Sequence, residues 1–207
     1  MDAPDMTPHA FVFDLFGVVI SFDDSIVYRR IAKYCDDPDR AMPALENLVS
    51  CPKLITGQLT LLEIHDGLVE NHGLSLTPDE FDTLWREPYS ESMVGIGIVL
   101  EALRTKYQLL LLSNVDAYYW TTIRARHPEL EHFDSILLSC ELGLAKPDRR
   151  VFAHAAATAG VASADCFFID DKLQNIEAAR SCGFSAHLFN GVPGLRAALR
   201  RVGVEHL

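Results

Sequence analysis

The stretch that decides the fold is Phe11-Val-Phe-Asp14-Leu-Phe16-Gly17-Val-Val-Ile20, an apolar run interrupted by one carboxylate. Residues 10–13 are continuously apolar and of strand length, which is typical of a strand covered by helices on both faces. An unpaired carboxylate at the end of such a strand is costly to bury. Because the residues that follow Asp14 are too apolar for an ordinary exposed turn, we interpret Asp14 as a functional residue rather than as a helix cap.

Three more short apolar runs follow, at residues 109–112, 136–138 and 166–169. Stretches with helical character lie between and after them, at residues 95–103, 117–126, 149–158, 174–181 and 195–202. Strands that alternate with helices predict an α/β fold built on a doubly wound parallel sheet.

One spacing breaks this alternation, because Asp14 and Ser113 lie 99 positions apart. A strand, helix and strand unit needs only about 30 residues, so roughly 70 residues are surplus. We expect them to form a small α-helical cap, inserted at 21–92 into a core made of 1–20 and 93–207. Thr60-Leu-Leu-Glu63 and Thr77-Pro78-Asp79-Glu80 match the pattern that begins a helix, which supports the helical reading.

Three prolines of this insertion, Pro38, Pro43 and Pro52, are read as turn positions.

Composition narrows the functional classes. The chain has 207 residues, 49% hydrophobic and 23% charged, as expected of a globular domain, and its formal net charge of −11 disfavours nucleic acid and anionic membranes as partners. The five scattered cysteines indicate neither a disulfide framework nor a zinc site. No segment resembles a signal peptide or a membrane span. We therefore expect a cytoplasmic enzyme that is a monomer or a homodimer.

Polar residues also follow two other predicted strands. Ser113 and Asn114 come after the second apolar run, and Asp170 and Asp171 come at the end of the fourth. Ligands of open parallel sheets bind beyond the carboxyl ends of the strands, so these residues can converge on one crevice. Lys146 can join them from a loop, because the proline after it disfavours helical geometry.

Carboxylates gathered around one crevice repel each other unless a cation is present. Asp14, Asp170 and Asp171 offer a small number of hard oxygen ligands, which suits Mg²⁺ that keeps several waters and touches a substrate phosphate. A carboxylate in such a site is a candidate nucleophile that forms an aspartyl-phosphate. Ser113 and Lys146 would stabilise the transferring oxygens.

Four runs of the sequence, in this order, resemble the motifs of the haloacid dehalogenase-like hydrolase superfamily. They are Phe13-Asp14-Leu-Phe16-Gly17-Val18, Leu112-Ser113-Asn114, Lys146-Pro147-Asp148, and Phe168-Ile169-Asp170-Asp171-Lys-Leu-Gln-Asn175-Ile-Glu-Ala. The stretch from His127 to Gly183 is most similar to the branch that contains α-D-glucose-1-phosphate phosphatase. The resemblance covers nearly the whole core and leaves only the cap without a motif.

The resemblance implies a role for each matched residue. Asp14 would be the nucleophile and a metal ligand, with the Phe16 backbone carbonyl and Asp171 as further ligands. Ser113, Asn114 and Lys146 would hold phosphate. Asp170 would bind the metal through water or orient Lys146, and Asn175 would support the acidic loop. The expected substrate is a small phosphorylated metabolite such as a sugar phosphate.

Phe16 departs from the family pattern, because phosphatases of the superfamily usually carry an aspartate there that protonates the leaving oxygen. General acid and base help is worth roughly 10² to 10⁴ in rate. An aromatic residue at this position also resembles the metal-independent 2-haloacid dehalogenases, but those lack the acidic pair that is present here. Two alternatives therefore stay open, a 2-haloacid dehalogenase and a module that binds a phosphometabolite with little turnover.

Overall fold

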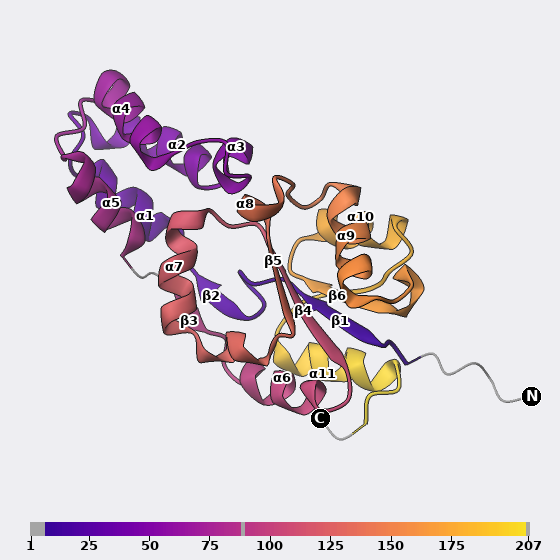
Figure 1. The fold of residues 1–207 in the computed structure, drawn as a ribbon. Coiled ribbons are helices and arrows are strands. Elements are labelled where there is room, and N and C mark those ends of the chain that lie inside the picture. The colour runs from indigo at the N-terminus through magenta and orange to yellow at the C-terminus, as the bar shows by residue number, and fades with distance from the viewer. Residues whose placement is uncertain (1–6, 88–89, 206–207) are drawn as a thin grey trace, which may run out of the picture.

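The structure, a computed structural model, describes residues 7–87 and 90–205. Residues 1–6, 88–89 and 206–207 lie outside the described residues. The expectation that the N-terminus is not a signal peptide falls on the first of these segments. Figure 1 shows a sheet with helices packed around it and a group of helices set to one end.

The sheet has five parallel strands in the order β5-β4-β1-β6-β7. They are β1 (Ala10–Phe13), β4 (Gln108–Ser113), β5 (Ser135–Leu138), β6 (Cys166–Asp170) and β7 (Ser185–Leu188). β1 lies in the middle, and its neighbours β4 and β6 are the strands that carry the other predicted site residues. The doubly wound parallel sheet predicted from the sequence is confirmed.

Helices cover both faces of the sheet (Figure 1). One face packs against α6 (Ile96–Arg104), α7 (Ala117–Arg126) and α11 (Val192–Arg201), and the other against α9 (Arg149–Ala159) and α10 (Leu173–Ser181). Side chains alternate along β1, with Phe11 and Phe13 in the first core and Val12 in the second, all fully buried. Short elements complete the core: α8 (Ser139–Leu142) and the 3₁₀ helices at Pro128–His132 and Ser163–Asp165.

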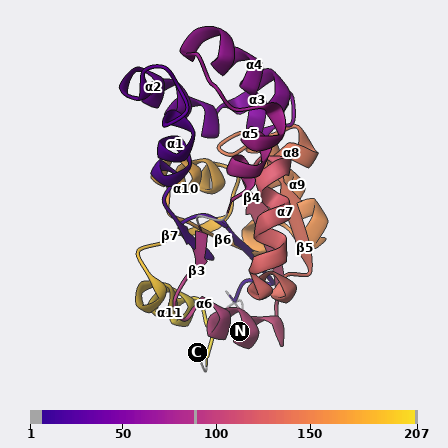
Figure 2. The same ribbon diagram turned by 90° about the vertical axis from the view of Figure 1, so that its left-hand side faces the viewer.

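The insertion after β1 is helical, as expected (Figures 1 and 2). It contains α1 (Ser25–Ala32), α2 (Pro38–Val49), α3 (Pro52–Ile55), α4 (Leu61–His72) and α5 (Pro78–Arg86), which share their own apolar core. Thr60 and Thr77 each complete the capping box that their sequences predicted. A small antiparallel pair, β2 (Ile20–Phe22) and β3 (Ser90–Ser92), joins these helices to the sheet domain.

The reading of the three prolines as turns was wrong. Pro38 and Pro52 are the first residues of α2 and α3, and Pro43 lies inside α2. The first helical position tolerates proline because its N–H has no partner within the helix. At Pro43 the surrounding helix outweighs the loss of one hydrogen bond.

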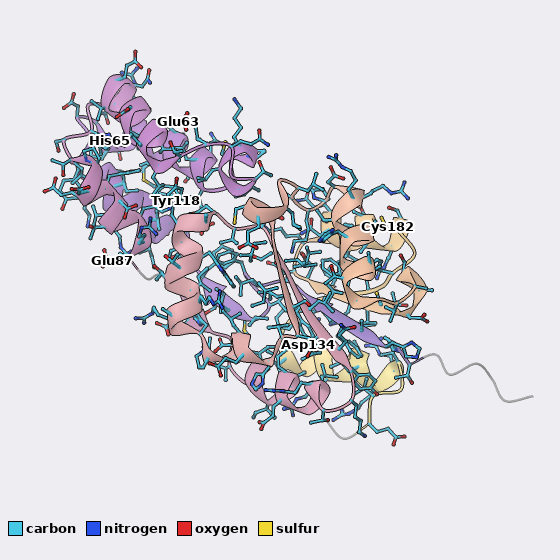
Figure 3. The ribbon with its side chains drawn as sticks, viewed as in Figure 1. Glu63, His65, Glu87, Tyr118, Asp134 and Cys182 are labelled. Carbon is cyan, nitrogen blue, oxygen red and sulfur yellow. The ribbon has the colours of Figure 1, made fainter. Side chains whose placement is uncertain are left out.

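Two groups of contacts hold the cap on the core. At α5, the Arg86 guanidinium donates to the Tyr118 carbonyl (2.9 Å) and lies 5.2 Å from the centre of the Tyr118 ring, at the end of α7 that faces the cap helices (Figure 3). At α3, the Ser139 hydroxyl of α8 donates to the Ile55 carbonyl and accepts from the Val115 N–H (3.0 Å). The cap is thereby fixed above the ends of β1 and β4.

Candidate active site

Asp14 follows the central strand directly. Its N–H donates to the Ile169 carbonyl of β6 (2.8 Å), which fixes its backbone against the neighbouring strand. The carboxylate is 5% exposed and accepts from the Leu15 N–H (2.7 Å). The expected position of this carboxylate at the carboxyl end of the sheet is therefore what the structure shows.

Lys146 reaches the same point from the loop before α9. Its ammonium is buried and lies 2.6 Å from Asp14 Oδ1 and 2.9 Å from Asp170 Oδ2. Burial alone would lower the pKa of Lys146, but its contacts with Asp14 and Asp170 outweigh burial and leave that pKa raised. A charged ammonium is thus held where it can neutralise two carboxylates.

Asn114 holds this lysine in place. Its side-chain amide donates to the Lys146 carbonyl (2.8 Å) and its side-chain oxygen accepts from the Lys146 N–H (2.8 Å). Asn114 was expected to contact the phosphate, but its side chain is already hydrogen bonded to the Lys146 backbone. Its action on a bound phosphate would therefore be through Lys146 or through its own backbone.

The carboxylate of Asp170 is fully buried at the end of β6 and bonded on both oxygens. Oδ1 accepts from the Lys172 N–H (2.8 Å), and the Asn175 amide donates to each oxygen at 3.0 Å. Together with the ion pair to Lys146, these bonds favour the orienting role over direct metal binding for Asp170. Asn175 supports the acidic loop, as the resemblance implied.

Three polar atoms of the site, Asp171 Oδ1, Asn175 Oδ1 and the Ser113 hydroxyl oxygen, are buried without a hydrogen-bond partner among the residues that the structure describes. Ser113 is fully buried. Buried polar atoms are normally paired, because an unsatisfied one costs about 1 to 3 kcal/mol. Unpaired atoms at this point suit a cation at Asp171 and an anionic ligand at Ser113.

The electrostatics also suit a cation. Asp14, Asp170 and Asp171 each offer an oxygen, and these oxygens lie within 4.8 Å of one another. Burial raises the pKa of Asp14 to about 7 against the opposing charge of Lys146, and Asp170 and Asp171 add to the rise. Burial and the charge of Asp170 raise the pKa of Asp171 as well. One ammonium does not balance three carboxylates, and a hard divalent cation such as Mg²⁺ fits the oxygen donors present.

Gly17 leaves room for this arrangement. It has a φ of +81°, and a Cβ there would lie 2.5 Å from Asp171 Oδ2. Glycine adopts this backbone conformation without strain, whereas other residues do not.

Gly17→Ala is expected to lower the free energy of unfolding by about 1 to 2 kcal/mol and to weaken Mg²⁺ binding, because the new methyl group displaces the Asp171 carboxylate. Urea unfolding and calorimetric Mg²⁺ titration measure the two effects. Gly67→Ala is the matched control, since Gly67 lies inside α4 with open space around it, and that change should leave Mg²⁺ binding unaltered. Equal Mg²⁺ affinity of Gly17→Ala and the unaltered chain would contradict the placement of the metal beside Asp171.

A cleft of about 440 Å³ opens between the cap and the core residues around Lys146. Lys146 and Asn114 line it from the core, and Val49 and Ile55 line it from the cap. Phe16 also lines the cleft, with its ring packed edge to face on Phe22 at 5.0 Å between centroids. The cleft has the size of an ordinary small-molecule site.

Asp116 is a cleft residue that the sequence argument missed. Its carboxylate caps α7 by accepting from the Tyr118 and Tyr119 N–H groups (both 2.9 Å), and Trp85 of the cap donates to it at 3.4 Å. Burial raises the pKa of Asp116 against these bonds. An aspartate before a helical run is a cap signal that could have been read from the sequence, but its contact with Trp85 could not.

No helix within residues 7–87 and 90–205 is long and apolar enough to span a bilayer. The five cysteines are free thiols.

Comparisons with known proteins agree with this geometry. A family model described as haloacid dehalogenase-like hydrolase matches residues 8–183. The chain is 26% identical over 182 residues to a D-ribitol-5-phosphate phosphatase of Bacteroides thetaiotaomicron, covering 84% of this chain and 87% of that protein. It is 28% identical over 202 residues to a phosphatase of Mycobacterium tuberculosis, covering 88% of each.

Among solved structures, the fold is similar to that of a HAD family enzyme of Bacteroides thetaiotaomicron in complex with magnesium and inorganic phosphate. The TM-score is 0.76 at 25% sequence identity, and the match covers 89% of this chain and 95% of that one.

Proposed function

We propose that this chain, which belongs to the haloacid dehalogenase-like hydrolases, is a Mg²⁺-dependent phosphatase that transfers the phosphoryl group of a small metabolite to Asp14 and then to water. The family resemblance of its four motifs is confirmed, and the chain is a hydrolase. The observation that carries the proposal is the buried pairing of Asp14 with Lys146 beside the unpaired oxygens of Asp171 and Ser113. Phosphatase relatives along most of the chain support it.

The Mg²⁺ ion would be held by Asp14, Asp171 and the Phe16 backbone carbonyl, with Asp170 acting through water. When bound, it would neutralise charge on the carboxylates and on the phosphoryl oxygens. The other residues then have separate tasks. The Ser113 hydroxyl donates a hydrogen bond to a phosphoryl oxygen, and Lys146 supplies positive charge beside the attacking oxygen.

The reaction is a pair of displacements at phosphorus. A carboxylate oxygen of Asp14 forms a bond to phosphorus, and the bond from phosphorus to the leaving oxygen breaks with its electron pair on that oxygen. Water then forms a new bond to the same phosphorus, and the bond to Asp14 breaks with its electron pair returning to the carboxylate. The proton that water releases balances the proton that the leaving oxygen takes up from solvent, and inorganic phosphate leaves. The Asp14 carboxylate is regenerated, so no other reactant is consumed.

We further expect this chemistry to take place in the cytoplasm, in a monomer or homodimer without nucleic-acid or membrane partners. The net charge of −11 supports the last point.

The test is phosphate release from a panel of aryl, acyl and sugar phosphates, with Mg²⁺ and with EDTA. The proposal expects release that depends on Mg²⁺. Chloride release from 2-chloropropionate that persists in EDTA would favour the dehalogenase alternative. Tight binding of phosphate compounds without turnover would favour the binding module instead.

A second prediction concerns Phe16, which stands where phosphatases of the family usually have an acid. Three carboxylates of the insertion are candidates to supply the missing proton. Asp24 lines the cleft, whereas Asp23 is exposed and accepts from the Ser25 N–H, and Glu63 is engaged in the capping box of α4. Without a proton donor at residue 16, the leaving oxygen departs largely as an anion. The rate should therefore fall steeply as the pKa of the leaving group rises.

Plots of log kcat/KM against leaving-group pKa measure this dependence for the unaltered chain and for Phe16→Asp. The variant is expected to give the flatter plot, with a gain of roughly 10² for poor leaving groups if its carboxylate reaches the leaving oxygen. Phe16→Leu is the control, because it removes the ring without adding an acid. A shallow slope in the unaltered chain would show that another group already supplies the proton, and Asp24→Asn would then identify it by steepening the plot.

A further inference from the structure

The cap wall of the cleft offers a substrate few hydrogen-bond partners. It is formed by Val49, Ser50, Pro52 and Ile55, and the helix turns around it use their own backbone groups. The Ser50 N–H donates to the Leu48 carbonyl, the Ile55 N–H donates to the Cys51 carbonyl, and proline has no N–H.

The Ile55 carbonyl is also occupied, because it accepts the bond from Ser139 that closes the cap onto α8. Among the described residues, the polar side chains that the cap presents to the cleft are those of Ser50 and Asp24. Asp24 is itself hydrogen bonded to the Tyr28 hydroxyl. A polyol placed against this wall would lose water from hydroxyl groups that find no new partner, which is unfavourable.

Two aromatic rings extend this apolar wall, whereas polar side chains such as Asn114, Asp148 and Gln174 line the core side of the cleft. The rings of Phe16 and Phe22 pack edge to face with an interplanar angle of 67°, and both line the cleft. Phe16 lies two residues after Asp14 in the sequence, and both rings line the same cleft as Val49 and Ile55. Two rings and two branched side chains thus form one apolar side of the cleft.

The charges along the cleft disfavour a second anionic group on the substrate. Asp24, Asp116 and Asp148 all line the cleft. Of the two lysines that line it, Lys146 is held between Asp14 and Asp170, and Lys172 interacts with Asp171 beside the phosphate position. A carboxylate or second phosphate on the far part of the substrate would therefore meet like charge.

We propose that the substrate of this site is a monophosphate whose remaining part is compact, apolar and without a second negative charge, such as an aryl or branched alkyl group. This inference rests on the proposed phosphatase function and narrows its substrate class. One relative is named a D-ribitol-5-phosphate phosphatase, and another, which matches 35% of this chain, is named a sesquiterpene phosphatase. Because these names point to different substrates, the substrate class is inferred from the cleft of this chain.

The experiment compares kcat/KM within a set of aryl phosphates whose leaving groups are nearly equal in acidity, and compares competitive inhibition within a pair of alkyl phosphates. The first set is phenyl phosphate, 4-tert-butylphenyl phosphate and 3-(4-phosphonooxyphenyl)propanoate, and the second is n-pentyl phosphate against ribitol 5-phosphate. We expect the tert-butyl compound to exceed phenyl phosphate by about ten-fold or more, because a branched apolar group enters an apolar wall. The propanoate should fall below phenyl phosphate. The pentyl compound should inhibit hydrolysis of phenyl phosphate at a lower concentration than ribitol 5-phosphate, because competition for the cleft does not depend on the acidity of the leaving group.

Variants of the wall test the assignment. Val49→Thr keeps the shape of the side chain and adds a hydroxyl group, so the ratio of tert-butylphenyl to phenyl phosphate should fall by about five-fold. Ser50→Val should raise the same ratio, which keeps the test open if the first variant fails to fold. Val69→Thr is the matched control, since Val69 is 42% exposed on α4 away from this cleft, and it should leave the ratio unchanged.

The outcomes distinguish the proposed substrate class from the proposed phosphatase function. Stronger inhibition by ribitol 5-phosphate than by pentyl phosphate, or a tert-butylphenyl to phenyl ratio that neither wall variant moves, would overturn the substrate class while leaving the phosphatase function intact. Failure to release phosphate from every compound in the presence of Mg²⁺ would overturn the proposed function, and the substrate class with it.

Discussion

Asp14→Asn is expected to lower kcat/KM for aryl phosphates by at least about 10⁴-fold, because the amide keeps the shape of the side chain but is not a nucleophile. Asp14 lies at the end of the central strand, 2.6 Å from the Lys146 ammonium, so no neighbouring carboxylate takes its place without a rearrangement of the buried site. Asp170 is bonded to Lys146, Lys172 and Asn175 and is fully buried. The loss should therefore be close to complete.

Steady-state phosphate release and circular dichroism measure activity and folding in the same preparation. The variant should keep the melting temperature within a few degrees of the unaltered chain. Asp39→Asn is the matched control, because Asp39 is an exposed residue in the first turn of α2, and its activity should be unchanged. Activity of Asp14→Asn near that of the control would exclude Asp14 as the nucleophile.

Lys146→Ala is expected to reduce kcat/KM by roughly 10² to 10³ and also to destabilise the fold. The ammonium is buried between Asp14 and Asp170, so its removal leaves two carboxylates near each other without their shared cation. Removal of one partner from a buried ion pair costs about 3 to 5 kcal/mol. A smaller loss of stability in the presence of Mg²⁺ is expected, because the metal would replace part of the missing positive charge.

Phosphate release, vanadate inhibition and urea unfolding with and without Mg²⁺ measure these effects. Lys33→Ala, at the exposed end of α1, serves as the control for the loss of one positive charge. Vanadate inhibition of Lys146→Ala as strong as that of the control would place Lys146 outside the phosphate site.

Much of the core followed from sequence because its signals are local. The apolar runs that became β1, β4 and β6 are buried on both faces, so they lack polar alternation and are easily recognised. β5 is an edge strand and only partly buried, but it still carries the apolar run at residues 136–138. β7 was missed because Ser185–Leu188 lies at the sheet edge, is mostly half-buried or exposed, and carries no continuous apolar run. The three-residue strands β2 and β3 are too short to give a pattern.

Most of the candidate site residues could be placed together for a related reason, since Asp14, Ser113, Asn114, Asp170 and Asp171 lie at or just after the ends of strands that could be located. What the sequence could not supply was their pairing. The bonds from Asn114 to the Lys146 backbone and from Asn175 to Asp170 depend on how loops fold over the sheet. The cleft wall is less predictable still, because Val49 and Ile55 lie in the cap and their position over the core depends on how the cap docks at Ser139 and at Tyr118. The expected ends of the cap and the individual catalytic roles stay predictions.

The most direct test of the account is to look for phosphate attached to Asp14. The chain is mixed with an aryl phosphate and Mg²⁺, quenched in acid during turnover, and the peptide that contains Asp14 is analysed by mass spectrometry. The account predicts a phosphoryl group on Asp14 that is absent when EDTA is present and absent in Asp14→Asn. Steady phosphate release with no phosphoryl group trapped on Asp14 at any quench time, together with turnover by Asp14→Asn, would contradict it.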